Sequence, residues 1–529
     1  MSLALAACLG CTGKIDDATL RPGGGSQAGT GATSGSGSTT GGGSGTGAVS
    51  GGGTPTLVAG ELDVPYTRLT RVEYQATVQA AFSVTPDVSG IPNDSRIGPF
   101  TSNVGSPDPA QEFLLASEDL AAQIVPAKLP TCTGATAATC VKTNYQAPIE
   151  RLYRRSLTAA EVTSLANMIS PLEAAGVTSQ DATRAMLVSA LLSADFLFRS
   201  APLAGDAARG RRLSEHLGYA LWDAPPDATL VAAGAVTPSQ LGASLKEQAL
   251  RLGADARAVP VLARFLAQWL RVDTDDKLDD PNLSFATSPL YAELLAFVQN
   301  ALTKNVPVKS FVNGTQGFIQ KNNFAAYAMS PVSSSANVVP VTWTASSVRR
   351  GILGEEVFMD ATRNPDPGRR PIFRGHLVRS SLLCQPIASP PAELVALNTE
   401  VTDRTTDTRC AACHSLMDPI GKAFAPNDLD NTIGTPAPVV NGSGEVSGSF
   451  EDLPSLMDAI AGSQAYADCF SRNLLAFFLE QDPDLVDAAS IGDVSAVVKS
   501  GGSLADAIGQ AVVSLEKRSQ SSTPWCTGQ

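Results

Sequence analysis

The residues with the clearest chemical purpose in this sequence are Cys410, Cys413 and His414, which form a C-x-x-C-H motif. Two cysteines at this spacing can reach both vinyl groups of one haem and form thioether bonds. The histidine that follows directly is placed to offer its imidazole to the haem iron from the same side. The motif predicts one covalently attached c-type haem, with His414 as the proximal iron ligand.

Two other kinds of site use the same residue types. A C-x-x-C pair can be a redox-active disulfide, but motifs of the thioredoxin type lie in a βαβ context that this sequence does not predict. A zinc site needs four ligands, usually with a second C-x-x-C or a pair of histidines, and no such partner motif is present. Because the chain has only three histidines, a chance C-x-x-C-H is also less expected, and haem attachment is the favoured interpretation.

The sequence leaves the sixth ligand of the iron open. Met417 follows the proximal histidine by only three residues, so we expect it on the proximal side. His376, in a segment rich in Pro, Arg and Gly, and Met457, on a predicted helix downstream, are the two weak candidates for this ligand. Met359 and His216 are further options. An open sixth position would instead allow peroxide or oxygen chemistry.

The motif is followed directly by Asp418-Pro419-Ile420-Gly421. An Asp-Pro pair favours the start of a turn, and Gly421 would allow another part of the backbone to approach closely. We therefore expect a short helix at the motif that ends in a turn at Asp418-Pro419. No catalytic triad pattern, H-E-x-x-H motif, Walker loop or G-x-G-x-x-G motif occurs, so hydrolase and nucleotide chemistry have little support.

The first residues have the features of a bacterial lipoprotein signal. Residues 1–11 read MSLALAACLGC, a short apolar segment with small residues before a cysteine, although without a basic start. Leu5-Ala6-Ala7-Cys8 fits the local pattern, whereas cleavage before Cys11 leaves a longer apolar region. We expect a lipid on Cys11, or alternatively on Cys8, which would place the protein in the cell envelope, on a periplasmic or outer-membrane face.

A tether is predicted at residues 12–60, where Gly, Ser and Thr dominate the composition. Such a segment cannot bury enough apolar surface to fold, and its flexible chain would reach on the order of 30 Å. Lipid and tether together would hold a globular body off a membrane surface.

Charge and hydropathy limit the kinds of partner that this globular body can have. The formal net charge is -13, which disfavours nucleic acid as a partner. The longest apolar run, residues 185–198, is too short to span a membrane and contains Asp195, so it predicts a buried helix. The expected partners are therefore a membrane, through the N-terminal lipid anchor, and a redox protein.

An exported chain can form disulfides. Cys132 and Cys140 are close enough in sequence to close a small loop, and we expect them to be bonded. Cys384, Cys469 and Cys526 would then give one pair and one single thiol, with a pairing that the sequence does not settle.

The body from about residue 60 has mainly helical periodicity, which predicts a mainly α, multi-module fold. Thr158 and Glu161 have the spacing of a capping box and predict a helix through Met168. The other predicted helices are 66–82, 181–198, 213–222, 260–270, 291–302, 453–461, 466–479 and 504–515, and one strand is predicted at 338–343. After the signal and tether, the predicted modules are N-terminal helical (61–205), central helical (206–335), haem-attachment (336–435) and small C-terminal helical (436–529).

Several motifs occur in order along residues 62–515. They include RLTRVEY at 68–74, YRRSLT at 153–158, RLS with LW between Arg212 and Trp222, and C-x-x-C-H-x-x-x-D-P-x-G at 410–421. Together they resemble the multi-module, cytochrome-c-associated lipoproteins of planctomycetes and myxobacteria, which are built from domains of unknown function. The resemblance implies a cell-envelope, haem-associated protein and supplies no reaction.

Two departures from that family pattern stand out. Ser156 replaces a proline, and the acidic residue and Phe-Asp pair that usually follow the last motif are altered in residues 424–430, so no role of that acidic residue is carried over. Three functions are consistent with the sequence. The first is electron transfer by one c-type haem, the second is a haem-dependent peroxidase or oxidase, and the third is a non-haem surface binding or scaffold protein with a Cys410–Cys413 disulfide.

Overall fold

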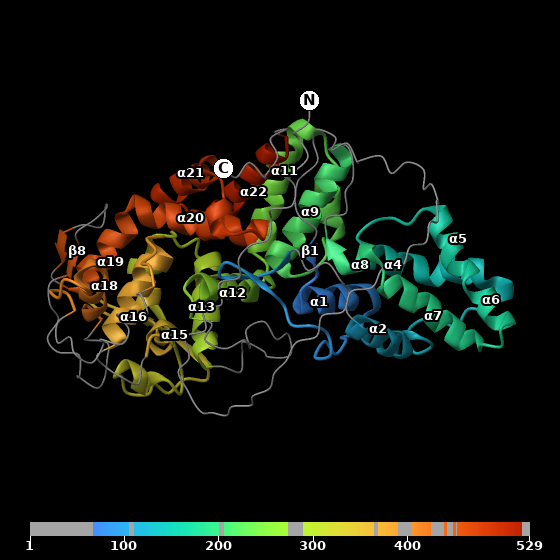
Figure 1. Ribbon diagram of the computed structural model, residues 1–529, viewed down its shortest axis with the longest axis horizontal. Coiled ribbons are helices and arrows are strands. Elements are labelled where there is room, and N and C mark those ends of the chain that lie inside the picture. The colour runs from blue at the N-terminus through green and yellow to red at the C-terminus, as the bar shows by residue number, and fades with distance from the viewer. Residues whose placement is uncertain are drawn as a thin grey trace, which may run out of the picture. The chain divides into compact units, whose positions relative to one another are not determined.

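The computed structural model describes residues 67–104, 111–199, 206–272, 289–363, 369–389, 404–424, 439–441, 448–450 and 452–520. Within these ranges the protein is mainly helical, as the sequence predicts (Figure 1). Sheets are small: the largest has three strands in the order β4 (Asn103–Val104), β1 (Thr67–Arg68) and β5 (Phe198–Arg199). None of the described helices is long and apolar enough to span a membrane.

The N-terminal part of the described chain has a hydrophobic core of its own, formed by residues between Leu69 and Leu197 together with Tyr219. Its helices are α1 (Arg71–Phe82), α2 (Gln111–Ile124), α3 (Ala137–Cys140), α4 (Gln146–Tyr153), α5 (Ala159–Asn167), α6 (Ile169–Ala174), α7 (Ser179–Leu191) and α8 (Ala194–Leu197). The Thr158 capping box is confirmed, since Glu161 N donates to Thr158 Oγ1 and Thr158 N donates to Glu161 Oε2.

The single helix predicted over residues 181–198 is wrong in one respect. The chain leaves the helical path after α7, and Ser193 caps a separate short helix, α8, by accepting a hydrogen bond from Asp195 N at 3.2 Å. Residues 198–199 then enter the sheet as β5. A serine that competes for backbone hydrogen bonds thus divides an apolar run that looked continuous.

From α9 onward, one large core of the described residues runs from Leu213 to Leu515 and includes Phe100, while Ile319, Phe324 and Tyr327 form a small separate cluster. Its central helices are α9 (Asp206–Trp222), α10 (Ala228–Gly234), α11 (Pro238–Gly253), α12 (Ala258–Trp269), α13 (Pro289–Thr303) and α14 (Ser310–Asn313), followed by the hairpin of β6 (Gln316–Gln320) and β7 (Val338–Thr342). The last four helices are α19 (Leu453–Gly462), α20 (Gln464–Leu479), α21 (Ala488–Lys499) and α22 (Leu504–Gln520). The module boundaries drawn from the sequence stay predictions. Buried side chains of all four proposed modules belong to this one core, the N-terminal module contributing Phe100.

Helix α20 is a centre of this shared core. Its Phe470 ring lies 6.0 Å from Phe265 and 5.4 Å from Trp269 of α12, and 6.3 Å from Phe311 of α14, with near-perpendicular planes. Edge-to-face contacts of this kind stabilise beyond the area they bury. Helices α21 and α22 pack beside α20, and α22 also packs against α11 (Figure 1).

Four cysteines form two disulfides. Cys132 is bonded to Cys140, the pair expected from their spacing, and Cys384 is bonded to Cys469, which settles a pairing that the sequence left open. Cys526 lies outside the described residues, as do Cys8, Cys11 and the whole segment 12–60.

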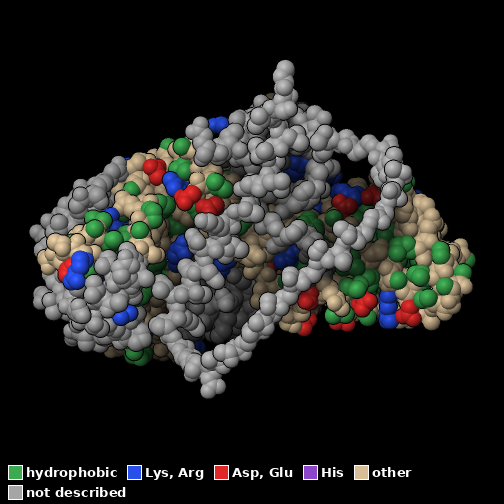
Figure 2. Space-filling model, viewed as in Figure 1, with side chains coloured by type: hydrophobic (Ala, Val, Ile, Leu, Met, Phe, Trp, Pro, Cys, Tyr) green, Lys and Arg blue, Asp and Glu red, His purple; other side chains and the backbone are tan. Residues whose placement is uncertain are grey.

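The described surface mixes side-chain types. On the face in Figure 2, acidic and basic side chains lie among hydrophobic ones over the N-terminal helices. Leu114 and Leu115 of α2 are examples of exposed apolar side chains in the described chain, with 39% and 54% of their surface accessible. Single exposed leucines of this kind are ordinary on a globular protein and do not by themselves mark a binding face.

Candidate cofactor site

The C-x-x-C-H motif lies at the start of helix α18 (Ala411–Lys422). Cys410 is the residue that precedes the helix, and Cys413 and His414 are in its first turn. Both cysteines are free and half-buried, in contrast to the four cysteines in disulfides. The site therefore presents two accessible thiols and an imidazole within one turn of a rigid element.

His414 lies on the buried side of this helix. Residues 417, 418 and 421 follow it at intervals of three, four and seven, and all three are buried. These intervals place side chains on one face of a helix. The imidazole, with 18% of its side-chain surface exposed, is thus held at the edge of the packed face of α18.

The Nδ1 atom of His414 is already engaged. It lies 3.0 Å from Oδ1 and 3.1 Å from Oδ2 of Asp418, one helical turn further along α18. A carboxylate can only accept here, so Nδ1 carries a proton, and in the neutral imidazole Nε2 is the nitrogen with a free lone pair. This is the tautomer that a metal-binding histidine needs.

The turn that the sequence predicted at Asp418-Pro419 is wrong. Helix α18 continues through Pro419 and ends at Lys422. Proline lacks the N–H that would bond to the residue four positions earlier, so an isolated helix would tend to break here. Packing against a neighbouring helix keeps this one intact. Sequence reasoning missed Asp418 as a functional residue for this reason, although its i, i+4 spacing from His414 was a usable signal.

The neighbouring helix is α16 (Arg370–Leu377), and the two backbones touch at two glycines. A Cβ atom at Gly375 would lie 1.8 Å from the carbonyl oxygen of Met417. A Cβ atom at Gly421 would lie 1.7 Å from the carbonyl oxygen of Pro371. The close backbone approach expected at Gly421 is confirmed, and the two contacts show that the helices run antiparallel.

A π-helical segment, η8 (Val378–Leu382), continues α16 and adds a polar contact to the motif helix. Arg379 Nε donates to the carbonyl oxygen of Leu416 at 2.7 Å. This carbonyl lies on α18 between His414 and Pro419. The buried Arg379 side chain therefore stabilises α18 close to His414.

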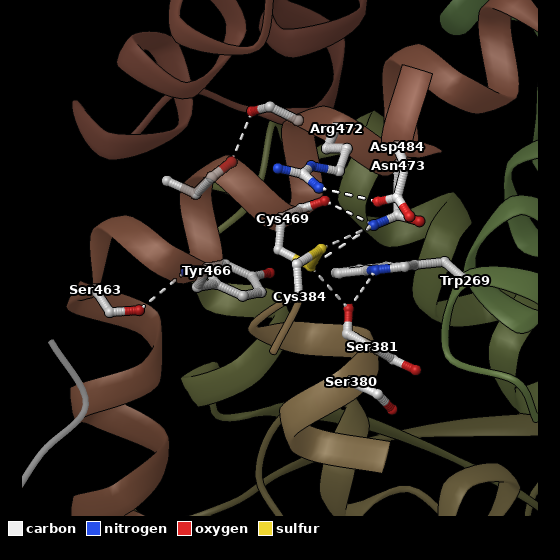
Figure 3. The surroundings of a disulfide bond; sticks show 12 residues. Trp269, Ser380, Ser381, Cys384, Ser463, Tyr466, Cys469, Arg472, Asn473 and Asp484 are labelled. Atoms are coloured by element: carbon white, nitrogen blue, oxygen red, sulfur yellow. Dashed lines mark hydrogen bonds and ion pairs between the residues drawn. A yellow bond between two sulfur atoms is a disulfide. The ribbon is translucent and has the colours of Figure 1, made fainter. Parts of the chain in front are cut away.

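The segment after η8 is fastened to α20 by the Cys384–Cys469 disulfide (Figure 3). The indole N–H of Trp269 donates to the Ser381 carbonyl oxygen at 2.6 Å, and Asn473 Nδ2 donates to the Cys469 carbonyl oxygen at 2.8 Å (Figure 3). The disulfide and the Trp269–Ser381 hydrogen bond thus connect the support of the motif helix to the main core, while the Asn473 bond lies within α20.

The sixth-ligand candidates are placed differently. His376 is on α16, the helix packed against α18, and is half-buried. Burial and the nearby Arg271 lower the pKa of His376, so its imidazole is neutral near pH 7. Met457 is completely buried in the large core on α19, a helix that packs against α14 and α20. The helix of His376 thus packs extensively against the motif helix.

The other two options for the sixth ligand, Met359 and His216, are also among the described residues. Met359 is buried in the large core on α15 (Glu356–Ala361). His216 lines a pocket together with Glu73, Arg199 and Glu480, and burial lowers the pKa of its imidazole. Among the described residues its Nε2 atom has no hydrogen-bond partner. His216 is thus part of a separate polar pocket.

The donor set at α18 fits a haem better than a bare metal ion. Across the described ranges, no three His, Cys, Asp or Glu side chains are grouped so that they could hold a metal ion. A zinc site needs such a group. Haem attachment needs two thiols and one imidazole, and Cys410, Cys413 and His414 supply these groups at the start of α18.

Two segments of the chain are similar to known families. Residues 210–329 match the model PSD4, described as a protein of unknown function (DUF1592), and residues 349–432 match PSCyt3, described as a protein of unknown function (DUF1588). No curated protein and no solved structure matches the chain. The second segment includes α16, α18 and the C-x-x-C-H motif. Over these two segments, the chain is therefore similar to domains of unknown function that follow each other in a multi-module arrangement.

Proposed function

We propose that this protein carries one covalent c-type haem on α18 and acts as a redox protein of the cell envelope that exchanges electrons with a partner protein. The observation that carries the proposal is the combination at α18 of two free thiols with a histidine whose Nδ1 is already bonded. Only Nε2 of His414 then remains for the iron. When bound, the haem supplies a one-electron redox couple.

The residues of the chain have separate tasks in this proposal. Cys410 and Cys413 hold the cofactor covalently, which prevents its loss outside the cytoplasm. His414 binds the iron, and the antiparallel packing of α16 on α18 keeps the imidazole in position. The large helical core serves as the scaffold that presents this site to a partner.

The envelope location rests on the N-terminal sequence. A lipid on Cys11, or on Cys8, followed by the tether of residues 12–60, would keep the body within reach of a membrane surface. Loss of membrane association in Cys11→Ala, measured by fractionation, is the expected result. Unchanged association in Cys11→Ala together with release in Cys8→Ala would assign the lipid to Cys8.

The haem assignment is tested by expressing the protein in a host that matures c-type cytochromes. We expect an intact mass increased by one haem and a reduced α-band that survives acid–acetone extraction. The double variant Cys410→Ala/Cys413→Ala should lose both, whereas the control Cys132→Ala/Cys140→Ala, which removes a disulfide, should retain both. A colourless wild-type protein with a Cys410–Cys413 disulfide would instead support a surface scaffold.

A haem-dependent peroxidase is the second candidate, and the His414–Asp418 contact favours it. An imidazole bonded to a carboxylate is a stronger electron donor to iron, which is the property that cleavage of a peroxide bond needs. High-spin iron and rapid reaction with hydrogen peroxide would favour the peroxidase. Low-spin iron with two protein ligands would favour electron transfer.

A further inference from the structure

Asp418 is well placed to act on the haem ligand. Both of its carboxylate oxygens lie within 3.1 Å of His414 Nδ1, and only 6% of the residue is exposed. An exposed charge would be screened by water and salt, but a buried carboxylate interacts strongly with its neighbour. The contact therefore orients the imidazole and brings the carboxylate close enough to act on it electronically.

The helix packing fixes the position of this carboxylate. Gly375 contacts the backbone at Met417, directly before Asp418, and Gly421 contacts the backbone at Pro371, one turn later along α18. The backbone is thus held on both sides of Asp418. Because His414 is on the same helical face at i-4, the distance between the two side chains is set by the helix itself.

We propose that Asp418 is a positioning residue for His414 that also lowers the reduction potential of the haem attached at Cys410 and Cys413. By accepting the Nδ1 hydrogen bond it holds Nε2 toward the iron and increases the electron density of the imidazole. A more basic ligand stabilises ferric over ferrous iron. This inference rests on the proposed haem attachment and adds a property to it. The haem has a low reduction potential and is suited to giving electrons to a partner.

The test is a redox titration of the haem-loaded protein and of Asp418→Asn. Asparagine keeps the shape and can still accept from Nδ1, but it lacks the charge. We expect covalent haem to be retained by mass and the ferrous-to-ferric ratio at a fixed applied potential to rise at least tenfold, which is a shift of about 59 mV for one electron.

The matched control is Asp407→Asn, which removes the same charge three residues before Cys410. Asp407 pairs with Arg409 and is not in contact with His414. A simple effect of net charge would shift the potential equally in both variants. Equal shifts, or no shift in Asp418→Asn, would overturn the proposal while leaving haem attachment intact.

A second variant covers the case in which Asp418→Asn does not hold haem. Asp418→Glu keeps the charge but moves the carboxylate by one methylene, so its potential should lie between the wild-type value and about 59 mV above it. A potential outside this range would contradict the proposal. A wild-type protein without covalent haem would disprove the proposed function itself, and the mass spectrum shows this before any titration.

Discussion

At the scale of single residues, the buried hydroxyl of Tyr327, away from the motif, lies within hydrogen-bond distance of two glutamates. The hydroxyl of Tyr327 lies 2.6 Å from Glu293 Oε2 and 2.9 Å from Glu355 Oε2, and it accepts a hydrogen bond from Glu356 N at 2.8 Å. One hydroxyl proton cannot serve two carboxylates. One of the two glutamates must therefore carry a proton of its own, and we assign it to Glu355, whose pKa burial raises to about 8.

The surroundings agree with this assignment. Glu293 also accepts hydrogen bonds from Gln320 N and Asn323 Nδ2, as an ionised carboxylate does. Burial, reinforced by the nearby Glu293, raises the pKa of Glu355 to about 8, although the hydrogen bond with Tyr327 and the charge of Arg349 act in the opposite direction. Glu293 and Tyr327 belong to the segment 210–329, and Glu355 belongs to 349–432. The hydrogen bonds at the Tyr327 hydroxyl therefore connect the two segments that match known families.

The variant Glu355→Gln should change how stability depends on pH. In the unfolded chain this carboxyl ionises near its ordinary value of 4.5, whereas in the folded protein it keeps its proton up to about pH 8. The folded state thus binds more protons in this window, and stability falls as pH rises through it, by up to about 1.4 kcal/mol per pH unit. Glutamine does not titrate, so this part of the slope should disappear.

Urea unfolding at pH 5, 6, 7 and 8 measures this effect. Burial also raises the pKa of Glu73, so a smaller slope of the same sign should remain in Glu355→Gln. The control Glu161→Gln should keep the wild-type slope, because hydrogen bonds from Arg155 lower the pKa of Glu161 to about 2, below the window. A slope in Glu355→Gln equal to that of wild type would show that Glu355 is ionised in the folded protein.

At the scale of elements, the crossing of α16 and α18 depends on two positions without side chains. Gly375 and Gly421 allow the helices to approach until a backbone carbonyl of each lies where the Cβ atom of the other would be. The same contact keeps α18 helical through Pro419 and holds His414 and Asp418 on one face. The geometry of the proposed haem ligand thus depends on backbone contact between two short helices.

Replacing Gly421 by alanine should disrupt this crossing. The added Cβ atom would lie 1.7 Å from the Pro371 carbonyl oxygen, a backbone atom that cannot rotate away. The overlap should destabilise the protein by about 1–3 kcal/mol in urea unfolding, or more if the helices separate. The control is Gly492→Ala, an exposed position in α21 with no atom within 4 Å, which should stabilise by about 0.5–1 kcal/mol. Similar effects of both substitutions would contradict the close approach.

The same elements show what could be predicted from the sequence. Local signals were sufficient where they determine structure: the Thr158 cap begins α5, and apolar periodicity predicts α12 and α20. The segment around α16 has too little periodicity, since it is rich in Arg, Pro and Gly and is held by tertiary contacts. Asp418 was missed because Asp-Pro favours a turn in isolation, and only the packing of α16 makes it helical.

At the scale of the whole described chain, buried polar contacts connect the N-terminal core to the large one. Arg199 of β5 forms ion pairs with Glu73 of α1, at 3.2 Å, and with Glu480, which ends α20. Its guanidinium also lies over the ring of Tyr219, 5.0 Å from the centroid. Loss of one member of a buried set of this kind leaves a charge without its partner, so these contacts favour one relative arrangement of the packed elements.

Disulfides constrain the chain over different distances, and this predicts unequal contributions to stability. Cys384 and Cys469 are 85 residues apart and connect the segment after η8 to α20, whereas Cys132 and Cys140 are 8 residues apart within one local segment. Loop-closure entropy gives about 4–5 kcal/mol for the longer loop and about 2–3 kcal/mol for the shorter one. Cys384→Ala/Cys469→Ala should therefore lower the free energy of unfolding more than Cys132→Ala/Cys140→Ala, in urea titrations under non-reducing conditions. Reduction of the wild-type protein breaks both disulfides, whereas Cys132→Ala/Cys140→Ala removes only the shorter loop. If both changes lower the free energy of unfolding equally, the long-range disulfide does not fasten the support of α18 to the core.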